Sequence, residues 1–108
     1  MSLSEAKSID LIDTRGRFVF CSILDDWDWS NPTEHLEALQ SKINTYLMFI
    51  ETGEIFEVYP AAKDRRIVIL ARLKDDYPEV ALRFFKVAKK ELRKAGHRLE
   101  YRLGFPDD

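Results

Sequence analysis

Two short runs of apolar residues constrain the fold of this chain more than any other feature. The first, at residues 17–24, reads RFVFCSIL, and the second, at residues 67–73, reads IVILARL. Each run is rich in aromatic and β-branched residues and is too short for a lone helix, so each predicts a strand. Both runs place apolar side chains on both faces. Strands of this kind lie at the centre of a sheet and need cover on both sides.

Further segments extend the predicted sheet. Residues 9–13 form a short apolar-rich run before a turn at Gly16, so they predict the first strand of a β-hairpin with the run that follows. Residues 97–103 alternate between apolar and charged side chains, as a half-exposed strand does. Residues 54–59 alternate weakly before Pro60, and we expect either a short edge strand or an irregular return.

Two segments have the three- and four-residue spacing of amphipathic helices. The first begins after Asn31, a capping residue that is followed by Pro32, and is expected to end near Glu51. The second is expected to begin after Asp76 as its cap and to end near Ala95, before a glycine.

The resulting order is strand, strand, helix, optional short strand, strand, helix, strand. It predicts an α+β fold with a single sheet of four or five strands and two helices. At 108 residues the chain forms one domain, which we expect to span residues 8–103, with residues 1–7 and 104–108 as flexible termini. The single cysteine excludes an intrachain disulfide framework and favours a cytoplasmic setting. No stretch has the length of a membrane span, so no membrane association is predicted.

The second face of the predicted sheet is the first candidate for function. Crossovers between parallel strands are right-handed, so strands laid down in sequence order would place both helices on one face. The other face would then be uncovered, and its expected apolar residues are Val19, Cys21, Ile23, Val68 and Leu70. A contiguous exposed apolar patch usually marks an interface, which predicts a homodimer joined sheet to sheet. The alternative is a strand order that places one helix on each face.

The net charge of −2 hides two opposed halves of the chain. Residues 1–60 hold 11 acidic and 4 basic side chains, whereas residues 61–108 hold 8 acidic and 13 basic ones. Some of these basic residues lie at helical spacing on the solvent side of the second helix and could contact the phosphates of a nucleic acid. They are Arg83, Lys86, Lys90, Arg93 and Lys94. The simpler interpretation, which we favour, is a solvated helix face whose last-turn cations offset the helix dipole.

The polar and aromatic Asp25–Trp29 loop is the third candidate. With Glu34 and His35 nearby, its carboxylates could hold a divalent metal ion, but their spacing matches no ligand motif, so neither a metal nor a cofactor is predicted. Trp27 and Trp29 point the same way along an extended segment. They either pack over the helix start as a lid on the core or anchor a partner protein.

Catalytic groups are sparse in this sequence. Cys21 lies inside an apolar strand, which favours an inert buried thiol over a nucleophile. The four glycines are isolated, so there is no glycine-rich phosphate loop. We therefore expect a non-enzymatic protein-interaction module, with nucleic-acid association by the second helix as the alternative. A metal-dependent enzyme at the Asp25–His35 loop is the third hypothesis.

One part of the chain carries a resemblance to a known family. Asp28-Trp29, then Glu34-His35-Leu36, the run LQSKINTYLMFIETGE at residues 39–54, and Tyr59-Pro60 resemble a family of small uncharacterised bacterial proteins. That family is classed as a domain of unknown function. The resemblance implies a bacterial, cytoplasmic protein of one domain. It implies no activity, so no catalytic residue is transferred from it.

Overall fold

The computed structural model describes residues 3–105, so the predictions made for residues 1–2 and 106–108 lie outside it. The predicted α+β class is confirmed, because three helices accompany one four-stranded mixed sheet. In chain order the elements are β1 (Leu11–Arg15), β2 (Phe18–Asp25), α1 (Pro32–Glu51), α2 (Glu54–Val58), the 3-10 turn η1 (Pro60–Ala62), β3 (Arg66–Leu73), α3 (Glu79–Lys94) and β4 (Arg98–Leu103).

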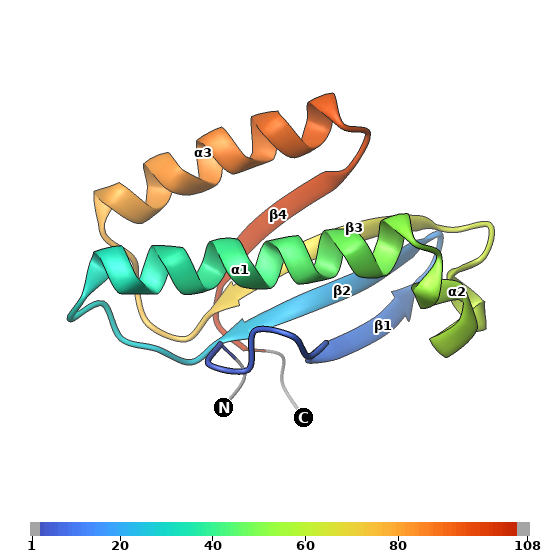
Figure 1. The fold of residues 1–108 in the computed structure, drawn as a ribbon, viewed down its shortest axis with the longest axis horizontal. Coiled ribbons are helices and arrows are strands. Elements are labelled where there is room, and N and C mark those ends of the chain that lie inside the picture. The colour runs from blue at the N-terminus through green and yellow to red at the C-terminus, as the bar shows by residue number, and fades with distance from the viewer. Residues whose placement is uncertain (1–2, 106–108) are drawn as a thin grey trace.

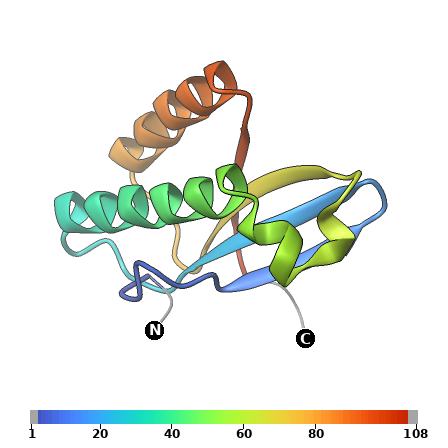
Figure 2. The same cartoon turned by 45° about the vertical axis from the view of Figure 1, so that its right-hand side comes forward.

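The strands lie side by side in chain order, β1-β2-β3-β4. β1 and β2 form an antiparallel hairpin, whereas β2, β3 and β4 run parallel to one another. Each parallel connection carries a long helix, and both α1 and α3 lie on the same side of the sheet (Figures 1 and 2). This is the arrangement that two right-handed crossovers produce. No helix within residues 3–105 has both the length and the apolar composition to cross a membrane.

The core lies between the two long helices and the sheet. Val19, Cys21 and Ile23 on β2 face the helices and have 0% exposure. The parallel register pairs Cys21 with Ile69, which places alternate residues of β3 on the same side. At β4, the ring of Tyr101 stacks on Phe85 of α3 with 4.6 Å between ring centroids. Burial of these side chains removes apolar surface from water and stabilises the two-layer fold.

Helix α1 begins and ends where the sequence predicts. The Asn31 side chain accepts a hydrogen bond from the backbone N–H of Glu34 at 3.2 Å, and Pro32 occupies the first turn. The helix ends at Glu51, and Gly53 then takes a φ of 82°, a conformation that glycine adopts without steric cost. Its buried face holds Leu39 and other apolar residues at helical spacing.

Residues 54–59 do not form the expected edge strand or irregular return, because Glu54–Val58 is the short helix α2. The left-handed turn at Gly53 redirects the chain, and Glu54 then lies in the first turn, where a negative charge is favourable. Ile55 is fully buried and the Tyr59 N–H donates to its carbonyl. The weakly alternating pattern of residues 54–59 also fits one turn of a helix, and the packing of Ile55 favours the helix.

The start of α3 also differs from the prediction. The helix begins at Glu79, with Pro78 at the capping position and no side-chain cap, so Asp76 does not cap it. The Asp76 side chain accepts from the N–H of Tyr77 instead. A residue that precedes proline is disfavoured in the helical region, which explains why the helix cannot include Tyr77. The expected end of α3 is confirmed, because Ala95 is its C-terminal cap and Gly96 follows with a φ of 86°.

The N-terminal segment is more ordered than expected. Leu3, which the sequence places in a flexible terminus, is 1% exposed and belongs to the core. Lys42 of α1 holds the segment, because its Nζ donates to the Glu5 carbonyl at 2.6 Å and to the Ser8 hydroxyl at 3.1 Å. The same ammonium lies 2.9 Å from the Asp10 carboxylate. A buried lysine therefore ties the start of the chain to α1.

Candidate functional site

The Asp25–Trp29 loop contains a buried carboxylate–imidazole pair, the Asp25–His35 dyad. Asp25 ends β2, His35 lies in the first turn of α1, and each side chain is 1% exposed. The Asp25 Oδ2 and His35 Nε2 atoms are 2.5 Å apart. His35 Nδ1 lies 2.9 Å from the carbonyl oxygen of Asp28, and a carbonyl only accepts, so Nδ1 carries a proton. A second proton lies between Oδ2 and Nε2.

Burial governs the protonation of this dyad. Loss of contact with water raises the pKa of Asp25, although the hydrogen bond and the charge of His35 act in the opposite direction. The carboxyl group therefore holds a proton more firmly than an exposed aspartate does. Asp25 Oδ1 also accepts from the N–H of Trp27 at 3.1 Å, which fixes the loop to the end of β2.

Both tryptophans of the loop contact the His35 ring. Trp29 stacks on it, with 3.6 Å between ring centroids and 13° between planes. Trp27 meets it edge to face at 5.7 Å. Both indoles are partly buried and pack against the core. This placement favours the interpretation of Trp27 and Trp29 as a lid, while their use as an anchor for a partner stays a prediction.

The geometry of the dyad favours structure over catalysis. Both ring nitrogens of His35 face acceptors of the protein itself, so neither is free to exchange a proton with a substrate. The dyad instead joins the end of β2 to the start of α1. As for metals, residues 3–105 contain no group of three or more His, Cys, Asp and Glu side chains that could hold an ion.

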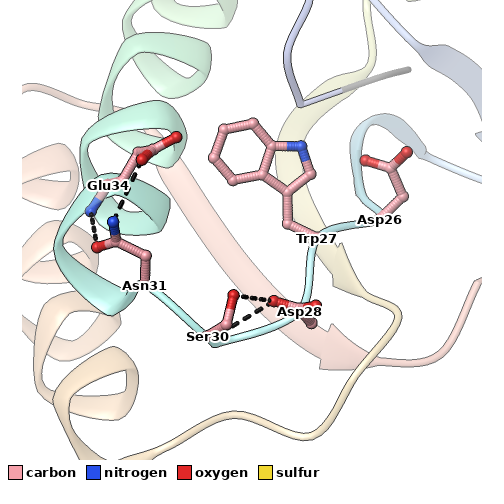
Figure 3. Close-up of a pocket in the computed structure, with 6 residues that line it drawn as sticks. All are labelled: Asp26, Trp27, Asp28, Ser30, Asn31 and Glu34. Atoms are coloured by element: carbon pink, nitrogen blue, oxygen red, sulfur yellow. Dashed lines mark hydrogen bonds between the residues drawn. The ribbon is translucent and has the colours of Figure 1, made fainter.

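A pocket of about 390 Å³ is lined by residues of the loop and of the start of α1, namely Asp26, Trp27, Asp28, Ser30, Asn31 and Glu34 (Figure 3). Four of its polar side chains, those of Asp28, Ser30, Asn31 and Glu34, are engaged with one another, whereas the buried Oδ1 of Asp26 has no hydrogen-bond partner among the described residues. Asp28 accepts from both the N–H and the hydroxyl of Ser30, which lowers the pKa of Asp28. Asn31 and Glu34 form a reciprocal pair at the start of α1. Of the loop carboxylates, Asp25 contacts the first turn of α1 and Asp28 binds Ser30 within the loop.

A second hollow, the α1–α3 groove, has a different character. It measures about 600 Å³ and is lined mainly by apolar side chains. Val80 and Val87 of α3 lie in it with 42% and 63% exposure, which is high for large apolar residues. The lining residues are Leu36, Gln40, Val80, Arg83, Phe84, Val87, Ala88, Glu91 and Leu92. We did not predict this surface from the sequence, although Val80, Phe84 and Val87 recur there at helical spacing.

The predicted basic stripe of α3 lies at the surface. Its five residues, Arg83, Lys86, Lys90, Arg93 and Lys94, are all exposed. Two of them have partners on the same helix. Arg83 Nη2 lies 3.4 Å from Glu79 Oε1, and Lys94 Nζ lies 3.3 Å from Glu91 Oε2. Contact with phosphates stays a prediction.

The five residues predicted to share an uncovered face do not lie together. Val19, Cys21 and Ile23 are on the helix side of the sheet, whereas Val68 pairs with Phe20 and faces away. Val68 and Leu70 are nevertheless 2% exposed, so they form no exposed apolar patch. The grouping was wrong because the register of β2 and β3, which decides the face, cannot be deduced from either strand alone.

Cys21 is the inert thiol that the sequence predicts. It is fully buried, and burial together with the charge of Asp13 raises its pKa to about 12. A thiol with such a pKa forms almost no thiolate near neutral pH, and the thiolate is the nucleophile.

The side of the sheet opposite α1 and α3, here called the open face, is rich in arginine. Alternation along the strands and the register of their pairing place these side chains there. They are Arg15, Arg66, Arg72, Arg98 and Arg102, and the acidic residues among them are Asp13 and Glu100. Sequence reasoning missed this cluster, because its members come from three strands.

The fold is that of a small α+β protein with two long helices over one face of a mixed sheet (Figure 1). The chain belongs to DUF6572, a family of unknown function whose model matches residues 1–104. This agrees with the resemblance noted in the sequence. Comparison with curated proteins and with solved structures gave no match.

Proposed function

We propose that this protein is a non-enzymatic interaction module that forms a homodimer through the α1–α3 groove. The observation that carries the proposal is the exposure of Val80 and Val87 along an otherwise apolar groove. Apolar side chains gain about 25 cal/mol for each Å² of surface that a partner removes from water. A second copy of the chain is the partner that the charges of the groove fit best.

Charge self-complementarity supports a second copy. In an antiparallel pair of α3 helices with the twofold axis at Val87, Arg83 lies four residues before the axis and Glu91 four residues after it. Arg83 of each copy therefore faces Glu91 of the other, with Phe84, Val87 and Ala88 between these pairs and Val80 outside them. Both side chains already line the groove.

The present partners of these two residues can be exchanged at little cost. The side chains of the Arg83–Glu79 pair are 72% and 76% exposed, and those of the Lys94–Glu91 pair are 65% and 60% exposed. Exposed pairs of this kind contribute about 0–1 kcal/mol. Pairing across an interface that excludes water strengthens the attraction.

The open face is a poorer interface for two identical copies. A twofold axis on that face would bring its arginines against those of the second copy, with only Asp13 and Glu100 to offset them. Like charges held together are unfavourable. The homodimer predicted from the sequence is therefore proposed here through a different surface.

Light scattering after size exclusion tests the proposal. At high micromolar concentration we expect the mass of a dimer for the unchanged chain and that of a monomer for Val87→Asp. Met48→Asp is the matched control, because Met48 is 62% exposed but does not line the groove. It should remain a dimer. A monomeric unchanged chain, or equal behaviour of the two variants, contradicts the proposal.

The second candidate function, nucleic-acid association by α3, is favoured by the exposure of all five of these basic side chains. Retention on labelled DNA at low salt tests it, with charge reversal at Lys86, Lys90 and Arg93 as the variant. Retention that this variant leaves unchanged, or the absence of retention, removes the candidate.

A further inference from the structure

We infer that the open face contains a binding site for a carboxylate group, formed by Arg15, Arg72 and Arg102, here called the arginine triad. This site is independent of the proposed dimer, because it lies on the other side of the sheet from the α1–α3 groove. The inference rests on geometry, on an unpartnered donor and on the balance of charge.

The triad brings together three strands that are distant in sequence. Arg72 of β3 is directly paired with Arg102 of β4, and Arg15 comes from β1 at the other edge of the sheet. All three line one small cavity of about 30 Å³, together with Asp13, Phe20 and Leu70. Arg72 therefore reaches across the face toward β1, and the three side chains converge.

The charges around this cavity do not balance. Three guanidinium groups face one carboxylate, that of Asp13, which lies 3.0 Å from Arg15 Nε. Burial and the charges of Arg102 and Arg15 lower the pKa of Arg72, and Asp13 offsets this only in part. A bound anion would relieve the repulsion among the three cations.

Arg72 also has an unused donor. Its Nε atom is buried and has no hydrogen-bond partner among the described residues. A buried donor without an acceptor is unfavourable, and the cost is larger for a charged group. An anionic oxygen in the cavity would accept this hydrogen bond. The structure thus contains both the charge and the unpartnered donor that an anion needs.

The shape of the cavity selects a carboxylate. A single water needs about 10–15 Å³ of such space, so the cavity takes about two oxygen-sized atoms. The two oxygens of a carboxylate match the parallel N–H bonds of a guanidinium fork. The buried floor of Leu70, which is 2% exposed, reduces contact with water and strengthens the attraction. The carboxylate belongs either to a free acid or to an acidic side chain of another protein.

Titration followed by the arginine Nε–H signals in ¹H–¹⁵N spectra tests the site. Sodium acetate and a short oligoglutamate peptide are the probes, and sodium chloride at matched ionic strength is the reference. We expect the Arg72 signal to shift saturably with acetate, with the peptide or with both, and not with chloride. The tighter of the two probes identifies the source of the carboxylate.

Variants distinguish a specific binding site from non-specific electrostatic attraction. With the Nε–H signal of Arg102 as the readout, Arg72→Gln should weaken acetate binding by about tenfold, and so should Arg72→Lys, which keeps the charge but loses the fork. Arg15→Gln, at an exposed position, should also weaken acetate binding, and it leaves Arg72 in place. Arg93→Gln on α3 is the control and should bind normally. No saturable shift, tighter binding of inorganic phosphate than of acetate, or full binding by Arg72→Lys overturns the inference.

Discussion

At the scale of single residues, the fold depends on two buried polar contacts that brace α1. The Asp25–His35 dyad fixes its first turn to β2, and Lys42 fixes its middle to the N-terminal segment. Buried polar groups are stable only when hydrogen-bonded, as these are, and the charges of Lys42 and Asp10 are also paired. Changes to either contact should therefore alter the free energy of unfolding more than changes to an exposed ion pair would.

The dyad predicts a dependence of stability on pH. The pKa of Asp25 in the folded chain lies above its ordinary value of 3.8, so the folded chain binds this proton more tightly than the unfolded chain does. Its contribution to the free energy of unfolding is fully present below about pH 3.8 and is lost as the pH rises through the raised pKa. Urea unfolding at several pH values measures this loss. Asp25→Asn cannot titrate at this position and should lack this loss of stability with rising pH. An equal dependence of the free energy of unfolding on pH in both proteins contradicts the prediction.

Lys42 predicts a large loss when one partner is removed alone. Lys42→Ala leaves the Asp10 carboxylate, whose side chain is 5% exposed, without its cation, and should cost about 3–5 kcal/mol. The double variant Lys42→Met with Asp10→Asn removes both charges and should lose less than Lys42→Ala alone. Denaturant unfolding of the single and double variants measures this, and additive losses would show that the two groups are not coupled.

At the scale of elements, the short helix α2 depends on the turn at Gly53. An alanine there must adopt a φ near 82°, although its Cβ would meet no atom closer than 3.9 Å. Gly53→Ala should therefore destabilise the chain by about 1 kcal/mol through backbone strain rather than through a clash. Denaturant unfolding measures the difference, with Met48→Ala at an exposed position of α1 as the reference. A neutral or stabilising change would mean that the turn relaxes.

The sequence predicts individual elements well where local signals agree. The caps and spacing of residues 31–51 define α1 to the residue, and the alternation of residues 97–103 defines β4. Residues 54–59 are ambiguous because one helical turn and one short strand fit the same pattern, and the packing of Ile55 decides between them. The start of α3 was misplaced because Pro78 outweighs the capping tendency of Asp76.

The surfaces were harder to predict than the elements. Which face of β2 the helices cover depends on its register with β3, a contact between segments more than forty residues apart in sequence. The arginine triad and the α1–α3 groove likewise form only when distant segments meet. The Asp25–His35 dyad could have been predicted from the sequence, because both residues belong to the loop considered as a possible metal site.

At the scale of the whole molecule, the two layers give the protein two surfaces with different chemistry. The helix layer presents an apolar groove with one acidic and one basic side chain at matched positions, and the sheet layer presents arginines. We propose that the first surface binds a second copy and that the second binds a carboxylate.

Mixing two charge variants tests the central claim, dimerisation through the α1–α3 groove, most directly. Arg83→Glu alone places two acidic residues against each other at both contacts, and Glu91→Arg alone places two basic residues there, so each variant should be monomeric. An equimolar mixture restores both opposite-charge contacts, and sedimentation equilibrium should then detect a heterodimer. Dimers of either variant alone, or a mixture that stays monomeric while the unchanged chain dimerises, would contradict the account.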